Sequence, residues 1–398
     1  MEEWKDCKLE DICDVRDGTH DTPKQTTDGK YLVTSKHIKG GRIDLSSAYK
    51  ISLEDFDFIN RRSKVDQWDI LISMIGTVGE ICLVSEQPDF AIKNVGLIKT
   101  ENEDLAKYLY YYLKSPEAQN NISARLKGTT QQYLSLGEIR QFPIKLPPLP
   151  TQQKIAAILS SLDDKIELNN KINTNLEHQA QALFKNWFVD FEPFGGKMPE
   201  GWKVGKLSEY CNFQEGYVNP AQTHNEYFDG DVKWLRAVDI NESFILNTSR
   251  TLTKCGFESA GKSAFLFKPG SIAISKSGTV GRLGIISDFM CGNRAVIGIE
   301  LKEQQNLSYI HQYLKSRQTE FPDMAVGSVQ KNLYVSILEN LDIIIPSKEV
   351  LEKFAAICIT FYDQIKTNCV ENNNLSFIRD TLLPKLMNGE IEVGEVII

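Results

Sequence analysis

The sequence lacks an apolar run long enough to cross a membrane as a helix. No stretch of its 398 residues approaches the roughly 18 consecutive apolar residues that a span requires. The first five residues, Met-Glu-Glu-Trp-Lys, do not have the form of a secretory signal. With 41% hydrophobic residues, the chain is long enough to build two or more globular cores. We therefore expect a globular protein of the cytoplasm.

Paired cysteines and clustered histidines are also missing. The eight cysteines show no Cys-x-x-Cys spacing, which indicates reduced cytosolic thiols rather than a disulfide or zinc framework. The five histidines are scattered without the spacing of metal ligands. The sequence therefore predicts no metal site in this chain.

Catalytic motifs are nearly absent. Residues 256–263, Gly-Phe-Glu-Ser-Ala-Gly-Lys-Ser, fit the phosphate-loop pattern, but such a loop requires a buried strand before it and a helix after it. Here residues 251–255 alternate like a half-exposed strand, and Pro269-Gly270 would soon end any helix. No motif for amino-group methylation or for adenosylmethionine binding is present. We interpret the match as a coincidence and expect no catalysis by the chain alone.

The charge balance is acidic, with a net charge of −8 at pH 7. This balance argues against a protein that binds nucleic acid over its whole surface. It leaves room for a local basic cleft, above all where partner subunits share the phosphate contacts.

Residues 151 to 187 contain no glycine and no proline. Apolar and other seam residues recur there at 4-3 spacing, which predicts a coiled-coil helix of about 40 residues. The prolines of residues 147–150 leave Thr151 as a candidate helix cap. The predicted seam is Ile155, Leu159, Leu162, Ile166, Asn169, Asn173, Leu176, Ala180, Leu183 and Trp187.

A second copy of this segment lies 199 residues further along, and only Arg379 interrupts its apolar pattern. Its seam is Phe354, Cys358, Phe361, Ile365, Asn368, Asn372, Leu375, Arg379, Leu382 and Leu386. Two equal helices separated by a compact domain can pack antiparallel. If Asn169 faces Asn372 and Asn173 faces Asn368, the numbers of facing residues sum to 541 and the asparagines form a polar layer. Such a layer penalises other registers, although these asparagines could instead lie on a hydrated rim.

The segments before the two helices also repeat. Residues 73–79, Ser-Met-Ile-Gly-Thr-Val-Gly, match residues 275–281, Ser-Lys-Ser-Gly-Thr-Val-Gly, and each lies between two β-branched strands. Helices are expected at 104–114 and 307–315, followed by the related loops 128–134 and 327–333. The repeat predicts an α+β fold in the order domain, helix, domain, helix. The expected boundaries are 1–147, 148–190, 191–346 with a linker at 191–201, and 347–390.

The loops of both domains carry side chains that can hydrogen-bond to base edges or phosphates. Each of these residues could equally belong to a solvated turn. In the second domain, Lys276, Arg282 and Lys331 are candidates for phosphate contacts. The first-domain candidates are Thr19, His20, Thr34, Ser35, Lys36, His37, Thr77, Gln131 and Gln132. The second-domain candidates are Tyr217, Arg236, Asp239, Lys276, Thr279, Arg282, Gln330 and Lys331.

The ordered set of motifs, repeated twice, resembles the specificity (S) subunit of a type I restriction–modification system. The resemblance covers essentially the whole chain. It rests on residues 17–23 (Asp-Gly-Thr-His-Asp-Thr-Pro), the two Gly-Thr-Val-Gly loops, the Gly-x-x-Gln segments, and residues 147–155 (Pro-Pro-Leu-Pro-Thr-Gln-Gln-Lys-Ile). The second domain departs from the pattern at the Asp-Gly-Thr-His loop.

The resemblance implies two similar globular target-recognition domains, separated by a pair of long antiparallel coiled-coil helices in a pseudo-twofold internal repeat. Each domain would read one half of a bipartite site in double-stranded DNA. The helices would set the spacer and dock two methyltransferase (M) subunits, and restriction (R) subunits would join them. S-adenosylmethionine, ATP and Mg would then be bound by the partner subunits. Two other interpretations stay open, which are the S subunit of a bipartite type II system and a tandem adaptor that does not bind DNA.

Overall fold

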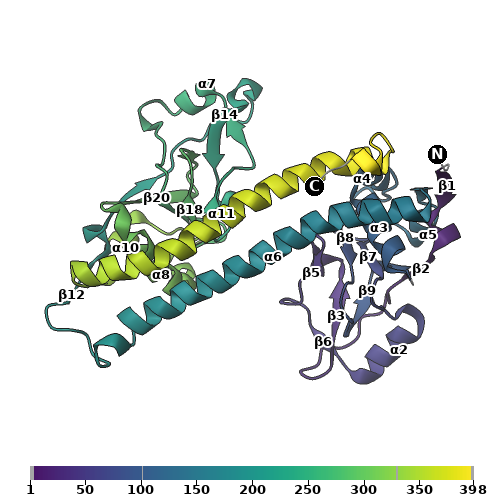
Figure 1. Ribbon diagram of the computed structural model, residues 1–398, viewed down its shortest axis with the longest axis horizontal. Helices are drawn as coiled ribbons and strands as arrows, with labels where there is room; N and C mark the ends of the chain where they lie inside the picture. Colours follow the sequence, from purple (N-terminus) through teal and green to yellow (C-terminus); the bar gives the residue numbers. More distant parts are fainter. Residues whose placement is uncertain (1–3, 101, 329, 396–398) are drawn as a thin grey trace. The chain divides into compact units, whose positions relative to one another are not determined.

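A computed structural model describes residues 4–100, 102–328 and 330–395 (Figure 1). The chain forms two compact units, one of residues 1–165 with 374–398 and one of residues 166–373. Residues 1–3 of the predicted first domain and Val329 of the predicted 327–333 loop lie outside the described residues. Within the described residues, no helix is both long and apolar enough to cross a membrane.

A four-stranded antiparallel sheet forms the centre of the first unit, with the strand order β2-β10-β7-β8. All four residues of β7 are buried, in keeping with a sequence, Ile-Leu-Ile-Ser, that does not alternate between apolar and polar. The strands are β2 (Asp14–Asp17), β7 (Ile70–Ser73), β8 (Ile81–Leu83) and β10 (Val95–Lys99).

Further strands and five helices complete this globular part, which we call the first head. Asn102 caps α3 by accepting hydrogen bonds from the amides of Asp104 and Leu105, and the buried residues Tyr108, Leu109 and Tyr112 follow at helical spacing. β1 pairs with β11, so the first and last strands of the head close it. The strands are β1 (Lys5–Lys8), β3 (Lys30–Thr34), β4 (Ile38–Lys39), β5 (Arg42–Ile43), β6 (Lys50–Ile51), β9 (Phe90–Lys93) and β11 (Pro143–Leu146). The helices are α1 (Leu9–Ile12), α2 (Leu53–Ser63), α3 (Glu103–Lys114), α4 (Pro116–Ala124) and α5 (Leu136–Arg140).

The globular part of the second unit, the second head, repeats this plan with one added strand. Its main sheet has the order β13-β20-β17-β18-β15, and β12 pairs with β21 to close the head. The strands are β12 (Lys203–Lys206), β13 (Cys211–Glu215), β14 (Phe228–Leu235), β15 (Phe244–Ile245), β16 (Thr251–Leu252), β17 (Ile272–Ser275), β18 (Leu283–Ile286), β19 (Cys291–Gly292), β20 (Val296–Leu301) and β21 (Asp342–Ile345). The helices are α7 (Lys254–Glu258), α8 (Leu307–Ser316), α9 (Phe321–Met324) and α10 (Val335–Glu339). The predicted α+β fold and internal repeat are confirmed.

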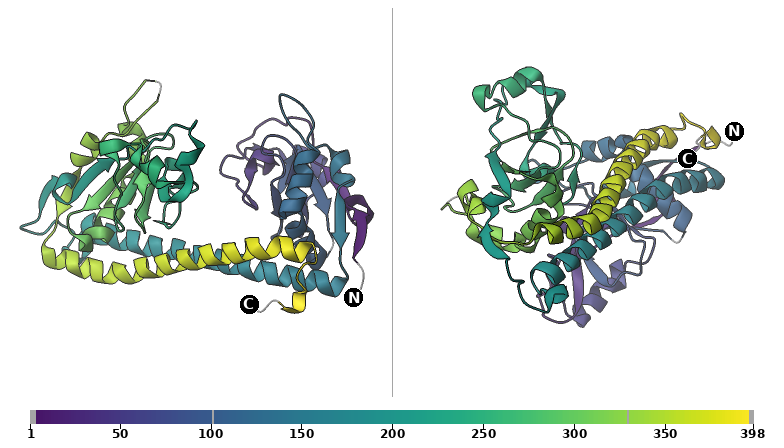
Figure 2. Two further views of the ribbon diagram at one scale, coloured as in Figure 1. Left: turned by 90° about the horizontal axis from the view of Figure 1, so that it is seen from above. Right: turned by 60° about the vertical axis from the view of Figure 1, so that its left-hand side comes forward.

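Two helices of 40 residues each, α6 (Leu149–Phe188) and α11 (Lys348–Met387), are the longest elements (Figure 2). α6 begins two residues before Thr151, so the prediction that Thr151 caps this helix is wrong. Pro150 is tolerated within the first turn because the amide groups there have no partner inside the helix. The side chain of Gln152 donates a hydrogen bond to the carbonyl of Pro147, 2.7 Å away, just before the helix begins.

The antiparallel pairing of α6 and α11 contains the asparagine layer. The side chain of Asn169 donates to Oδ1 of Asn372 at 2.9 Å, and that of Asn368 donates to Oδ1 of Asn173 at 2.8 Å. In both pairs the residue numbers sum to 541. Asn169, Asn173 and Asn368 are buried, so a hydrated rim does not describe them. The polar groups therefore have partners in this register, and another register would leave them buried without one.

Arg379, which interrupts the second seam, forms an ion pair within the first unit. Its guanidinium Nη1 lies 2.6 Å from Oδ1 of Asp163, and the two side chains are only 22% and 24% exposed. The hydroxyl of Tyr111 in α3 donates to the other carboxylate oxygen at 2.9 Å. The charge at a seam position thus helps to attach the first head to the helices.

We expect Arg379→Leu to destabilise the chain by about 1–3 kcal/mol, because it leaves the Asp163 carboxylate poorly solvated and without its cation. The double variant Asp163→Leu/Arg379→Leu should recover much of this loss. Chemical denaturation of the purified chain measures both, with Lys353→Ala, which breaks an exposed pair of α11, as the control. Equal destabilisation by the single and double variants would contradict this account.

Candidate nucleic-acid interface

Four strand ends meet at one edge of the main sheet of the first head. β2 ends at Asp17 and β7 ends at Ser73, while β10 begins at Val95 and β8 at Ile81, because neighbouring strands are antiparallel. The hairpin loop of residues 127–133 joins this edge through a bridge between Ile75 and Tyr133. We call residues 17–20, 34–37, 74–80, 93–94 and 127–133 the first loop cluster.

His20 is held at this edge by two hydrogen bonds. Its Nδ1 lies 2.8 Å from Oδ1 of Asn94, and its Nε2 lies 3.0 Å from Oδ2 of Asp17. Asp17 is buried and also pairs with Arg62 of α2. The His20 side chain remains 64% exposed, so it is oriented and still accessible. The amide of Thr19 donates to the carbonyl of Ile92 at 3.0 Å, which fixes the backbone beside it.

Three of the predicted residues at 34–37 take part in internal hydrogen bonds instead. The buried Ser35 hydroxyl donates to the carbonyl of Asn94 at 2.9 Å and accepts from the amide of Met74 at 3.2 Å. The His37 ring is fully buried and accepts from the amide of Thr34 at 2.9 Å, and burial lowers its pKa. We therefore withdraw Ser35 and His37 as DNA-facing candidates, because their side chains are buried and bonded within the head. Of this segment, Lys36 is exposed.

The two Gly-Thr-Val-Gly loops have the same internal structure. In the first, the Ser73 hydroxyl donates to the carbonyl of Thr77, and in the second that of Ser275 donates to the carbonyl of Thr279. The Ser275 hydroxyl also accepts from the Arg282 amide at 2.8 Å. The side chains of Thr77 and Thr279 are exposed, and Arg282 is half-buried. Each serine thus shapes its loop from inside.

Each of the two hairpin loops depends on a glycine with positive φ. Gly128 has φ +93° and Gly327 has φ +144°, and a Cβ at either would lie within 2.4 Å of the carbonyl oxygen three residues later. Only glycine fits there. The predicted candidates Gln131 and Gln132 in the first loop and Gln330 and Lys331 in the second are exposed.

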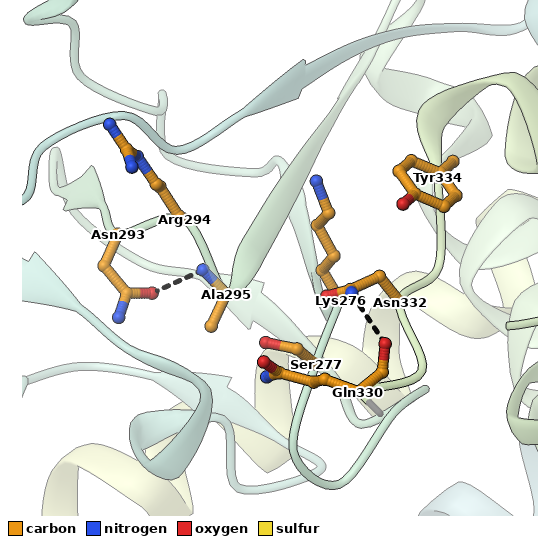
Figure 3. A pocket seen from close by; sticks show the side chains of 8 residues that line it. All are labelled: Lys276, Ser277, Asn293, Arg294, Ala295, Gln330, Asn332 and Tyr334. Carbon is orange, nitrogen blue, oxygen red and sulfur yellow. Dashed lines mark hydrogen bonds between the residues drawn. The ribbon is translucent and has the colours of Figure 1, made fainter. Parts of the chain in front are cut away.

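The second head has the equivalent edge, where β13 ends at Glu215, β17 ends at Ser275, and β20 and β18 begin. A polar pocket of about 340 Å³ opens there (Figure 3). We call residues 215–217, 276–282, 293–295 and 326–334 the second loop cluster. The pocket lies between Asn293 and Arg294 on one side and Tyr334 on the other.

Lys276 lines this pocket with its charge already paired. Its ammonium lies 2.6 Å from Oε1 of Glu215, and the two side chains are 13% and 18% exposed. The ammonium also lies 5.2 Å from the centre of the Tyr334 ring. We therefore withdraw Lys276 as a phosphate contact, since the adjoining carboxylate repels an anion and occupies the cation. Exposed Lys331 stays a predicted phosphate contact.

Arg236 and Asp239 stabilise a turn outside this cluster. The carboxylate of Asp239, 4% exposed, accepts hydrogen bonds from the amides of Arg236 and Ser249, both at 2.9 Å. The Arg236 guanidinium donates to the Ser249 hydroxyl at 2.6 Å. We withdraw Asp239 as a base contact because it is buried in this turn. Tyr217, 42% exposed, lies in the second loop cluster directly after Gly216.

Sequence reasoning missed Lys93 and Arg294. Lys93 lies two residues before Val95, which pairs with Ser73 in the main sheet of the first head. Arg294 lies two residues before Val296, which pairs with Ser275 in the second head. Basic residues at matching places in the two copies were the available signal. The strand pairing that makes the places equivalent is visible only in the structure.

The nucleotide-loop pattern of residues 256–263 does not form a phosphate loop. Gly256 lies inside α7, so the segment begins as a helix where a phosphate loop would have its open turn. The lysine of the pattern, Lys262, belongs to a short 3-10 helix of residues Gly261–Ser263.

The two heads are equivalent, and each carries exposed polar loops at the same edge of its main sheet. This arrangement is typical of a protein with two recognition domains in tandem. A family model described as the type I restriction modification DNA specificity domain matches residues 1–178 and again residues 199–375. The chain therefore belongs to the family of type I restriction–modification specificity subunits, and its two heads are target-recognition domains.

Relatives and one solved structure agree with this assignment. The chain is 28% identical to the HindI specificity subunit of Haemophilus influenzae, with 72% of this chain and 78% of the relative covered. It is 29% identical to the MjaIX specificity subunit of Methanocaldococcus jannaschii, covering 73% and 70%. The crystal structure of a type I S subunit from M. genitalium has a similar fold, with a TM-score of 0.56, 17% identity, and 97% and 96% coverage.

The edge of the first head depends on Gly18, where a Cβ would lie 2.4 Å from the carbonyl oxygen of Ile92. We expect Gly18→Ala to destabilise the chain by about 1–3 kcal/mol through overpacking. Gly137→Ala is the matched control, because a Cβ there meets nothing closer than 4.0 Å and alanine favours the helix. Urea denaturation compares them. A Gly18→Ala variant as stable as the control would show that this edge is not tightly packed.

Proposed function

We propose that this chain gives a type I restriction–modification complex its DNA specificity, with each head recognising one half of a bipartite site in double-stranded DNA. One observation carries the proposal. The two loop clusters lie at the same edge of equivalent sheets and share the serine-shaped Gly-Thr-Val-Gly loop and the glycine that packs on a neighbouring strand, yet they carry different polar side chains. A common framework with different side chains is suited to two readers of different sequence.

The side chains differ most where the loops are most alike. After the glycine that packs on the neighbouring strand, the first head has Thr19 and His20, whereas the second has Tyr217. The acidic residue before that glycine pairs with Arg62 of α2 in the first head and with Lys276 of β17's loop in the second. Donors and acceptors are thus placed differently in the two heads, so the two half-sites should differ.

We further propose that α6 and α11 dock methyltransferase subunits and set the length of the unread spacer. In the second unit, one side of the helix pair contacts the head through Glu177, Tyr362 and Cys369. Elsewhere the two helices expose apolar side chains, among them Leu168 and Ile172 of α6 and Ile357 of α11, which are 52%, 38% and 41% exposed. Exposed apolar side chains on a helix face favour a protein partner.

The chain is proposed to act without catalysis and without a cofactor of its own. S-adenosylmethionine would be bound by the M subunits, and ATP and Mg by the R subunits. The supporting observations are the misfit of residues 256–263 to a phosphate loop and the absence of a catalytic motif in the sequence. With R-subunit and M-subunit partners that act on chromosomal DNA, the cytoplasm is the proposed location.

Exchange of one head tests the recognition proposal. We expect replacement of residues 1–147 by the same region of another S subunit to change one half-site and leave the other unchanged, because the cores of the two units share no residue. Single-molecule sequencing of DNA methylated in cells measures both half-sites at once. The control exchanges residues 199–346 instead and should change the opposite half. A change in both halves after either exchange would contradict independent reading.

Lengthening both helices tests the spacer proposal. Four residues inserted after Lys165 and four after Leu375 face each other in the register that sums to 541, and both lie between the contacts of the first head at Asp163 and Arg379 and the asparagine layer. They add about 6 Å of helix, and DNA rises about 3.4 Å per base pair. We expect the unread spacer to lengthen by about one or two base pairs with both half-sites unchanged. Methylation sequencing is the measurement.

The insertion also turns each helix by about 40° beyond a full circle, so weaker methylation is expected as well. The control variant carries four substitutions at exposed positions of the two helices and no insertion. Its helices keep their length, so its spacer should stay unchanged. Methylation that keeps the original spacing after insertion would show that partner subunits, and not the helices, place the heads.

A further inference from the structure

The pocket of the second loop cluster presents hydrogen-bonding groups of fixed direction. Oδ1 of Asn293 accepts from the amide of Ala295 at 3.0 Å, which leaves the side-chain NH₂ of this pocket-lining residue as its available donor (Figure 3). Nδ2 of Asn332 donates to the carbonyl of Gln330 at 3.0 Å, which leaves its Oδ1 as an acceptor. Backbone contacts therefore decide which end of each amide is available.

Arg294 is the cation of this pocket whose charge is available. Lys276 is paired with Glu215 at 2.6 Å. Arg294 is exposed, and within residues 4–100, 102–328 and 330–395 no carboxylate lies at ion-pair distance from it. The guanidinium is a planar fork with five N–H donors.

A mixed set of donors and acceptors suits a base edge better than a phosphate. A phosphate accepts hydrogen bonds only, so the Glu215 carboxylate and Oδ1 of Asn332 would oppose it. A base pair presents both donors and acceptors in the major groove. Arginine in particular matches the O6 and N7 acceptors of guanine with two parallel hydrogen bonds.

The first head differs at the same place. Lys93 occupies the position of Arg294, and its ammonium donates to the hydroxyl of Thr22. A lysine is a point charge without the fork, and this one is engaged within the head. At equivalent backbone positions, the second head thus carries Arg294, whose guanidinium can form two parallel hydrogen bonds to a base, and the first head carries Lys93, whose ammonium cannot.

We propose that Arg294 is a specificity-determining residue of the second head and contacts a guanine of the second half-site through O6 and N7. Asn293 as donor and Asn332 as acceptor contact neighbouring groups on the same base edges. This assignment rests on the proposed recognition of DNA by the two heads.

The experiment uses the full chain assembled with its methyltransferase subunits. Methylation mapping with the wild-type complex first defines the site. Binding is then measured to a duplex with that site and to a set of duplexes in which each base pair of the second half-site is replaced in turn. The variants are Arg294→Lys and Arg294→Ala, with Lys331→Ala of the same loop cluster as the matched control.

We expect both Arg294 variants to lose discrimination at one G·C position by about 5- to 150-fold, the range for one bidentate base contact. Arg294→Lys should fail like Arg294→Ala because it keeps the charge and loses the fork. Discrimination in the first half-site should stay intact, which shows that the complex is folded. Lys331→Ala should weaken all duplexes by a similar factor and make the salt dependence shallower.

Several results would overturn the assignment. Uniform weakening of all duplexes by Arg294→Ala, with rescue by Arg294→Lys, would make Arg294 a phosphate contact. Unchanged discrimination, or a mapped second half-site composed only of A·T pairs, would remove it as a guanine reader. A wild-type complex that discriminates no sequence would instead contradict the proposed function itself, and the assignment would fail with it.

Discussion

The pairing of α6 with α11 is the interaction on which both units depend. In the first unit, Ile155 and Leu159 of α6 and Leu386 of α11 belong to the same core as Tyr108 of the head. In the second unit, Phe184 and Phe354 belong to one core with Tyr309, the equivalent of Tyr108. Each head is therefore built partly from helix residues. A shift in the register of the helices would disturb both cores, since interiors are closely packed.

The two heads attach to the helices through chemically different contacts. In the first unit Tyr111 of α3 donates to the Asp163 carboxylate, which Arg379 neutralises. In the second unit the tyrosine is on the helix, where the Tyr362 hydroxyl accepts from Gln312 at 3.1 Å and lies 2.7 Å from Nδ1 of His311. Burial lowers the pKa of His311 to about 3, so its ring is neutral in this contact. The repeat thus preserves the position of the contact and changes its charge.

The loop clusters follow the same principle. Residues with internal roles recur in both copies, such as Ser73 and Ser275 within the loops and the glycines that pack on a neighbouring strand. Less buried residues around them differ, as Lys93 and Arg294 do. The backbone is constrained because the strand ends and loops interlock, while the exposed side chains can vary without disturbing the core. This division supports the proposal that one repeated fold recognises two different half-sites.

The sequence by itself determined the repeat, the α+β class, the two long helices and the pairing of Asn169 with Asn372, because periodic apolar residues and glycine-dependent loops are local signals. Only the tertiary structure decided which loop side chains are accessible. Ser35, His37 and Asp239 are of the types that read DNA, yet the folded turns and strands around them bury their side chains. Lys276 is neutralised by Glu215, 61 residues away in the chain, and Arg294 reaches the pocket through strand pairing. Burial and charge pairing between distant segments leave no periodic signal, so sequence patterns could locate the loops but not the side chains within them that face the pocket.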